Sequence, residues 1–185
     1  WDLGNGTISF LQNPSATYFS SGSYTIKLTV SGSNGTATVT KTQYINVFAQ
    51  PTVKFKGSVT SGCFPLPVQF TDQSVAGNGT INLWLWDFGD GLSSALQNPL
   101  HTYKMSGSYN VTLRVRNTNG CLTTLSKAKY IDISSGASAG FSNSYPDNCS
   151  LPVAVKFNNL STGSGTISYQ WFFGDGSTST ETNPS

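Results

Sequence analysis

The sequence has little charge and few residues that favour helices. Lys, Arg, Asp and Glu make up only 10% of its 185 residues, against about 25% in an average soluble domain. Glu181 is the only glutamate and Met105 the only methionine, whereas Thr, Val, Tyr, Phe and Gly are plentiful. This balance favours strands and turns over helices.

Long apolar runs and clusters of cations are absent as well. No apolar run approaches the roughly 20 residues that a membrane-spanning helix needs. The ten Lys and Arg residues are dispersed and form no basic stripe of the kind that binds nucleic acid. We therefore expect no membrane span in this segment and no nucleic-acid partner. Polarity that comes from hydroxyl and amide side chains suits a protein outside the cell.

Cysteine is scarce, with three residues at Cys63, Cys121 and Cys149. None belongs to a Cys-x-x-Cys pair, and the only histidine, His101, is distant from all three in sequence. A zinc site therefore fails on ligand number and spacing. A disulfide in an oxidising compartment is the better interpretation.

One six-residue stretch is present three times, at residues 1–6, 86–91 and 171–176, with a constant spacing of 85 residues. The Asn-Pro pairs at residues 13–14, 98–99 and 183–184 keep the same spacing. A period of this length fits a small domain and is too long for one supersecondary unit. The chain is therefore predicted to be a tandem array of domains.

Only the central repeat, residues 51–135, is complete. Residues 1–48 match the second half of it and residues 139–185 match the first half. A half-domain of this kind would expose core aromatics and open strand edges. We therefore expect a segment of a longer protein that continues in both directions. The rival, strand exchange between chains, is disfavoured because residues 1–15 and 171–185 would supply the same segment.

Alternation of apolar and polar residues predicts about seven strands in the central repeat. Trp84, Trp86 and Phe88 share one face, and Tyr109 begins an inward series that continues through residues 111, 113 and 115. Residues 62–67 read as a turn because two prolines oppose ladder pairing. Two packed antiparallel sheets, an immunoglobulin-like sandwich, satisfy this pattern.

Two leucines do not fit the inward pattern. Leu83 and Leu85 lie on the face opposite to the tryptophans. We expect them to be covered by a loop or to contact a neighbouring domain or chain.

Asp87, Asp90 and His101 are the candidate chemical groups. A carboxylate pair could serve acid–base catalysis or calcium binding. However, Phe172 replaces Asp87 in the third repeat, and Asn5 and Ala16 replace Asp90 and His101 in the first. The two aspartates are therefore assigned to stabilising a turn, and His101 to a structural role, bonding across the strand that leads to Tyr103. We expect no catalytic residue, no metal and no cofactor.

The aromatic side chains Trp84, Trp86 and Tyr109 invite a second chemical interpretation. Exposed, they could form a platform on which sugar rings stack. Their period-two placement puts them on the inward face of their strands, which favours packing in the core.

A group of residues in the central repeat resembles the PKD (polycystic kidney disease) domain. They are Trp86, Asp87, Phe88, Gly89, Asp90, Gly91, Asn98, Pro99, His101, Thr102, Tyr103, Gly107, Tyr109 and the pair Tyr130-Ile131. Leu3, Asn5, Ala16, Phe19 and Phe172 depart from the pattern in the partial repeats. The resemblance implies an all-β chain of tandem immunoglobulin-like PKD sandwiches, one complete and two partial.

The form with cysteine at Cys63 and Cys121 resembles the repeats of very large surface proteins of gliding Bacteroidota. That resemblance implies type IX secretion, a stalk of many domains and an adhesive role. We expect a Cys63–Cys121 disulfide, which closes a loop of 58 residues and contributes about 4 kcal/mol. The alternative is a Cys121–Cys149 bond between adjacent domains.

The sequence therefore predicts a non-catalytic extracellular spacer or stalk in a cell-surface adhesin or filament. Its partners would be neighbouring PKD repeats and surface polysaccharide or other surface proteins. One alternative is an accessory module of a secreted hydrolase that binds polysaccharide or collagen. Another is lateral assembly into a fibre through Leu83 and Leu85.

Overall fold

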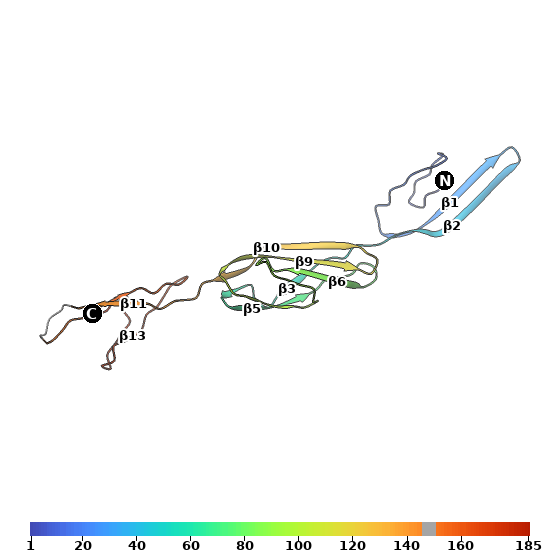
Figure 1. Cartoon of the computed structure of the whole chain (residues 1–185). Helices are drawn as coiled ribbons and strands as arrows, with labels where there is room; N and C mark the ends of the chain where they lie inside the picture. The colour runs from blue at the N-terminus through green and yellow to red at the C-terminus, as the bar shows by residue number, and fades with distance from the viewer. Residues whose placement is uncertain (146–150) are drawn as a thin grey trace.

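The computed structural model describes residues 1–145 and 151–185, which form strands, turns and loops without a helix. Hence none of these described residues forms a helix able to cross a membrane. Three lobes follow one another along an extended molecule, and the two termini lie in the two outer lobes (Figure 1). The predicted all-β fold is confirmed.

Strands are distributed unevenly over the lobes. The N-terminal lobe has one long antiparallel hairpin, formed by β1 (Gly22–Gly32) and β2 (Gly35–Val47). The central lobe has eight strands: β3 (Phe55–Gly57), β4 (Ser61–Cys63), β5 (Leu66–Asp72), β6 (Ile81–Asp87), β7 (Ser93–Ser94), β8 (Leu100–Tyr103), β9 (Gly107–Asn117) and β10 (Leu122–Ser134). The C-terminal lobe has four short strands: β11 (Phe141–Ser144), β12 (Lys156–Asn159), β13 (Trp171–Phe172) and β14 (Thr178–Ser179).

The central lobe is a two-layer sandwich. One sheet has the order β4-β10-β9-β6-β7 and the other the order β3-β5-β8. Alternate residues of each strand face the space between the sheets, because side chains of a strand alternate between its two faces. The buried core residues are Phe55, Val68, Phe70, Trp86, Phe88, Tyr103, Val111, Leu113, Val115, Ile131 and Ile133. This is the predicted immunoglobulin-like arrangement.

The outer lobes lack one part of this sandwich. In the N-terminal hairpin, Val30 is 54% exposed and Val39 is 51% exposed, whereas Val115, the equivalent of Val30, is completely buried in the central lobe. In the C-terminal lobe, Phe141 is 65% exposed although its equivalent, Phe55, belongs to the central core. The exposure expected of half-sandwiches is therefore present at both ends.

The predicted turn at residues 62–67 is wrong in part. Pro67 lies within β5, opposite Thr102 of β8, and Gly62 lies within β4, which pairs in parallel with β10. Pro67 is tolerated because β3 pairs only with residues 70–72 of β5. The missing N–H of Pro67 therefore leaves no ladder bond unmade.

The predicted Cys63–Cys121 disulfide is also wrong, because both cysteines are free thiols in the structure. Cys63 pairs with Ser134 at the end of β10, whereas Cys121 immediately precedes the start of β10. A strand of 13 residues separates them by about 40 Å, far beyond the roughly 7 Å between Cα atoms that a disulfide permits. Cys149, the partner in the alternative pairing, lies outside the described residues.

Candidate functional site

The sequence motif that defines the repeat forms a sharp bend at the end of β6. The Asp87 Oδ1 atom accepts a hydrogen bond from the N–H of Gly89 at 2.9 Å, and Asp90 Oδ1 accepts one from the N–H of Leu92 at 3.1 Å. Gly89 has φ +82°, and a Cβ atom there would lie 2.3 Å from the carbonyl oxygen of Asn110. The bend therefore requires glycine for both conformation and space.

His101 joins the bend to β8. Its Nε2 atom lies 2.7 Å from Asp90 Oδ2, and only 8% of the residue is exposed. The imidazole stacks on Phe88 at a centroid distance of 4.0 Å and meets the edge of Tyr103 at 4.6 Å. Asp90 thus supports the bend with one oxygen and holds the histidine with the other.

Tyr103 stabilises the bend through a hydrogen bond from inside the core. Its side chain is completely buried, and its hydroxyl donates a 3.0 Å hydrogen bond to the carbonyl oxygen of Phe88. Burial raises the pKa of Tyr103 well above its usual value, and the negative charge of Asp90 reinforces the shift. The Tyr109 hydroxyl, which is exposed, donates to the carbonyl oxygen of Met105 at 2.9 Å.

The first repeat stabilises its bend with an uncharged side chain. Tyr18, the equivalent of Tyr103, donates to the carbonyl oxygen of Leu3 at 2.8 Å. Asn5, the equivalent of Asp90, accepts a hydrogen bond from the N–H of Thr7 at 3.0 Å and donates to the carbonyl oxygen of Thr17. An uncharged amide therefore replaces the carboxylate in supporting the bend. This replacement indicates that Asp90 stabilises the backbone and does not act as an acid or a base.

The third repeat keeps the carboxylate. Asp175 accepts hydrogen bonds from the hydroxyl and the N–H of Ser177, which hold the pKa of Asp175 below its usual value. Among the described residues, no group of three or more His, Cys, Asp or Glu side chains is placed to hold a metal ion.

The tryptophans of β6 are structural, as their spacing predicts. Trp86 is 1% exposed and its Nε1–H donates to the carbonyl oxygen of Leu96 at 2.9 Å. Trp84 is partly buried and donates to Asp72 Oδ2 at 2.7 Å. These indoles therefore do not form an exposed platform for sugars. The role of Asp72 was not predicted, because no local pattern links it to Trp84.

A second polar cluster lies at the end of the central repeat that faces the first repeat. Asn117 is 1% exposed. Its Nδ2 atom donates to the carbonyl oxygens of Ala49 and Ala76 at 3.2 and 3.0 Å, and its Oδ1 atom accepts from the N–H groups of Asn119 and Cys121 at 3.1 and 3.0 Å. We call this cluster the linker clamp, because residue 49 belongs to the connection between repeats. Sequence reasoning missed it, although a polar residue in the inward phase of β9 was the available signal.

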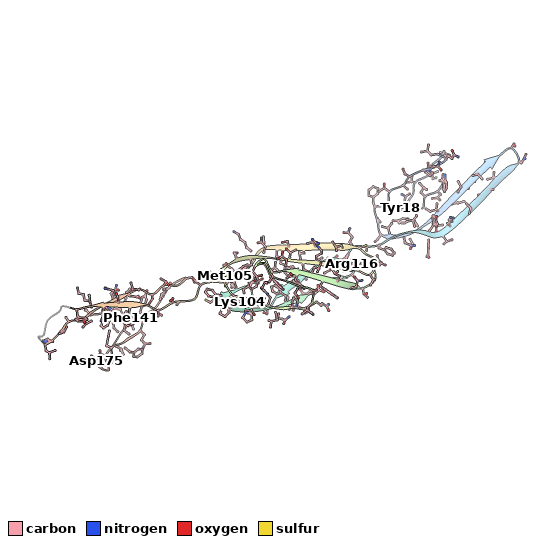
Figure 2. All side chains as sticks on the ribbon, in the orientation of Figure 1. Tyr18, Lys104, Met105, Arg116, Phe141 and Asp175 are labelled. Carbon is pink, nitrogen blue, oxygen red and sulfur yellow. The ribbon has the colours of Figure 1, made fainter. Side chains whose placement is uncertain are left out.

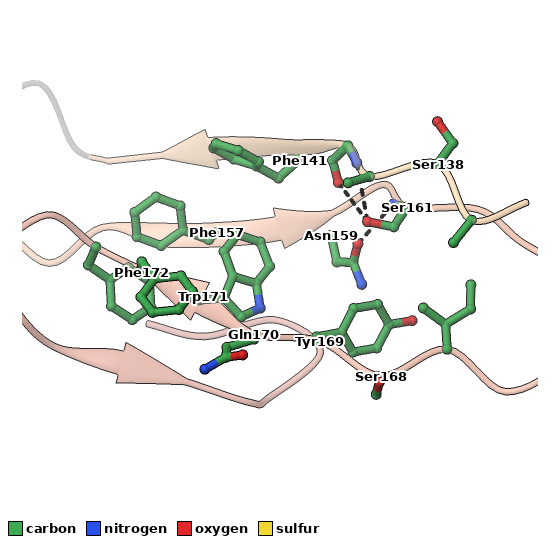
Figure 3. Close-up of a pocket in the computed structure, with 15 residues that line it drawn as sticks. Ser138, Phe141, Phe157, Asn159, Ser161, Ser168, Tyr169, Gln170, Trp171 and Phe172 are labelled. Carbon is green, nitrogen blue, oxygen red and sulfur yellow. Dashed lines mark hydrogen bonds between the residues drawn. The ribbon is translucent and has the colours of Figure 1, made fainter.

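A hollow of about 610 Å³ lies in the C-terminal lobe (Figure 3). Its wall includes Phe141, Phe157, Trp171 and Phe173, whose rings pack together at centroid distances of 5.3 to 6.4 Å. The equivalent aromatics of the central repeat are buried in its core. This hollow is therefore the uncovered inner face of a half-sandwich. A smaller hollow of about 300 Å³ in the N-terminal lobe, lined by Ile26, Leu28 and Val39 among others, has the same origin.

Comparison with known proteins gives consistent matches. A model of the PKD domain family matches residues 1–47 and 48–133. The collagenase ColQ1 of Bacillus cereus is 42% identical over 71 residues, which are 38% of this chain and 7% of that enzyme. A microbial collagenase of Vibrio alginolyticus is 31% identical over 93 residues, which are 50% of this chain and 11% of that enzyme. The chain thus matches only a small part of each curated relative.

Two crystal structures of isolated PKD1 domains also match part of this chain. The crystal structure of the PKD1 domain of the Vibrio cholerae metalloprotease PrtV is 32% identical to this chain, covers 45% of it and 99% of its own length, and gives a TM-score of 0.41. The PKD1 domain of Vibrio anguillarum Epp is 24% identical, covers 47% of this chain and 99% of its own length, and gives a TM-score of 0.42.

Proposed function

Because this chain belongs to the PKD domain family, we propose that it is a non-catalytic extracellular spacer that holds other parts of a longer protein apart. In its finer form, the proposal places the repeats in the stalk of a large cell-surface adhesin or filament of Bacteroidota, exported by type IX secretion and used in attachment or gliding. The linker clamp is the observation that carries the spacer role.

The linker clamp opposes bending between repeats. Relative motion is the ordinary expectation for domains joined by a short linker. Here the carbonyl oxygen of Ala49 is bonded to the buried Asn117, and its N–H is bonded to Asn78. A Cβ atom on Gly77 would lie 2.4 Å from the carbonyl oxygen of Gln50, so the linker runs directly against this loop. Bending the linker would break bonds to a side chain that has no access to water.

The connection to the third repeat has a similar support. The Ser164 hydroxyl donates to the carbonyl oxygen of Ser135 at 2.7 Å. Ser138 and Thr162 exchange backbone hydrogen bonds of 2.7 and 2.9 Å. The connector between the central and third repeats is thus held at two points. Three lobes in a row, of which the central one is about 40 Å long at the 13 residues of β10, then give a stiff spacer (Figure 1).

Small-angle X-ray scattering on the Asn117→Ala variant tests the spacer role. The alanine removes all four side-chain bonds of the clamp. We expect the variant to show a smaller radius of gyration than the native chain and a broader distribution of distances. Asn119→Ala, which changes an exposed amide of the same loop, is the matched control. Identical scattering from Asn117→Ala and the native chain, with both folded by circular dichroism, would refute the proposal.

A second candidate is an accessory module of a secreted hydrolase, favoured by the identity to the two collagenases. In that role, the chain would bind collagen or polysaccharide near a catalytic domain. Co-sedimentation with insoluble collagen fibres and with an insoluble polysaccharide such as chitin separates the two candidates. An accessory module should sediment with one of these solids. A spacer should stay in the supernatant when either solid is added.

A further inference from the structure

Leucine and arginine side chains form an ordered array on the outer side of the five-stranded sheet. The pairing of β6, β9 and β10 places these side chains opposite one another in two rows that run across the three strands. The first row is Leu83, Arg116 and Leu122, and the second is Leu85, Arg114 and Thr124. We call these six residues the Leu–Arg face. Figure 2 shows Arg116 at the end of the central repeat that faces the first repeat, away from Lys104 and Met105.

The sandwich itself does not require these residue types. In the third repeat, Ser168 and Gln170 occupy the positions of Leu83 and Leu85. In the first repeat, Thr29 and Ser31 occupy the positions of Arg114 and Arg116. Thr29 lies opposite Thr38, and their hydroxyls share a 3.0 Å hydrogen bond. The β1–β2 hairpin of the first repeat thus forms with small polar side chains where the central repeat has arginines, so pairing of these strands does not require the arginines.

The face carries uncompensated positive charge. Both arginines are exposed, and the ion pair found within the described residues joins His101 to Asp90, on the other side of the repeat's core. The nearest carboxylate along β6 is Asp87, which already accepts the N–H of Gly89. Thr112, which lies opposite Asp87 on β9, donates a 2.9 Å hydrogen bond from its hydroxyl to the hydroxyl of Ser126. Within residues 1–145 and 151–185, the two guanidinium groups therefore have no carboxylate partner.

Apolar surface accompanies the charge. Leu85 is 44% exposed and Leu122 is 47% exposed, and Leu83 is half-buried. Each arginine of the face has a leucine directly across the strand pair on β6. Burying such leucines against apolar side chains of a partner is favourable.

We propose that the Leu–Arg face binds a partner protein segment that presents two carboxylates flanked by aliphatic side chains. A guanidinium group binds a carboxylate through two parallel hydrogen bonds. Arg114 and Arg116 are two residues apart on one strand, about 7 Å, and acidic residues at positions i and i+2 of an extended segment have the same spacing. This interaction goes beyond the spacer role and does not depend on it.

Other occupants fit the face less well. A second copy would place arginine against arginine, which is repulsive. An acidic polysaccharide could bind the arginines, but it would place hydroxyl groups against the leucines, and burying those without hydrogen bonds costs free energy. The face has six residues, far fewer than the roughly 20–30 residues per partner of a stable interface, so we expect weak binding that falls with added salt.

The test uses the whole chain and a synthetic peptide, Leu-Thr-Glu-Thr-Glu-Thr-Leu, with NMR chemical shifts as the readout. We expect shifts confined to the Leu–Arg face and a dissociation constant that rises with salt. Arg114→Thr, the residue of the first repeat, should weaken binding about fivefold, and Leu85→Gln, the residue of the third, should weaken it measurably. Lys56→Thr, a change on the opposite sheet, should leave binding unchanged.

Each remaining outcome overturns the proposal. A peptide with glutamine in place of glutamate that binds equally well would remove the role of charge. An unchanged affinity in Leu85→Gln would remove the aliphatic contact. Polygalacturonate that shifts the same signals at lower carboxylate concentration than the peptide would assign the face to carbohydrate. Self-association of the native chain that is lost in Arg114→Thr would assign the face to a second copy. No chemical-shift change at any peptide concentration up to the solubility limit of the peptide would leave the face without a ligand of this class.

Discussion

Replacing Tyr103 by phenylalanine is expected to destabilise the central repeat by about 1–3 kcal/mol at neutral pH. The substitution removes a hydroxyl that donates to the Phe88 carbonyl oxygen at 3.0 Å, in a part of the core without access to water. The side chain of Tyr103 is completely buried and Phe88 is 2% exposed. The abandoned carbonyl oxygen therefore loses its partner without gaining water, which is the costly case.

The same variant should change the response to alkaline pH. Burial raises the pKa of Tyr103 in the folded protein well above the usual value for tyrosine, about 10. Above pH 10, the unfolded chain loses this proton while the folded chain retains it, so the native protein loses stability as pH rises. Phenylalanine has no proton to lose. The stability difference between the native chain and Tyr103→Phe should therefore shrink above pH 10.

Urea titrations followed through the methyl NMR signals of Val111, Leu113 and Val115 measure this effect in the central repeat alone. Tyr109→Phe is the matched control, because it removes a hydroxyl that bonds to Met105 at an exposed position. Water can replace that bond, so we expect a loss of about 0.5 kcal/mol. Equal losses of unfolding free energy in the two variants would refute the assigned role of the buried hydroxyl. So would a stability difference between the native chain and Tyr103→Phe that stays constant up to pH 11.

Two further predictions concern the bend and the cysteines. Gly89→Ala and Gly91→Ala both introduce a side chain at positive φ, +82° and +89°, which costs about 1–2 kcal/mol. Only the Cβ atom at position 89 meets a neighbour, the Asn110 carbonyl oxygen, so the same urea titration should show a further loss of about 1–3 kcal/mol for Gly89→Ala. Equal losses would contradict the close approach. Peptide mapping without reductant should find no Cys63–Cys121 linkage, and a linked peptide in quantitative yield would contradict the strand order.

Local pattern was sufficient for the parts of this protein that repeat or alternate. The spacing of 85 residues identified the array, because a repeated unit must fold the same way each time. The alternation from Tyr109 through Val115 identified the inward face of β9, because adjacent side chains of a strand point to opposite faces. Comparison of Asp90 with Asn5 identified the acidic bend as a brace. Each of these depends on residues that are close in sequence or on copies of the same motif.

Tertiary structure decided the features that depend on distant segments. The sequence contains two cysteines in one repeat, but only the path of β10 shows that they lie at opposite ends. Likewise, the bond from Trp84 to Asp72 and the linker clamp around Asn117 join strands and loops whose proximity follows from the packing of two sheets. Alternation fixes which way a side chain points; it contains no information about which distant group it meets there.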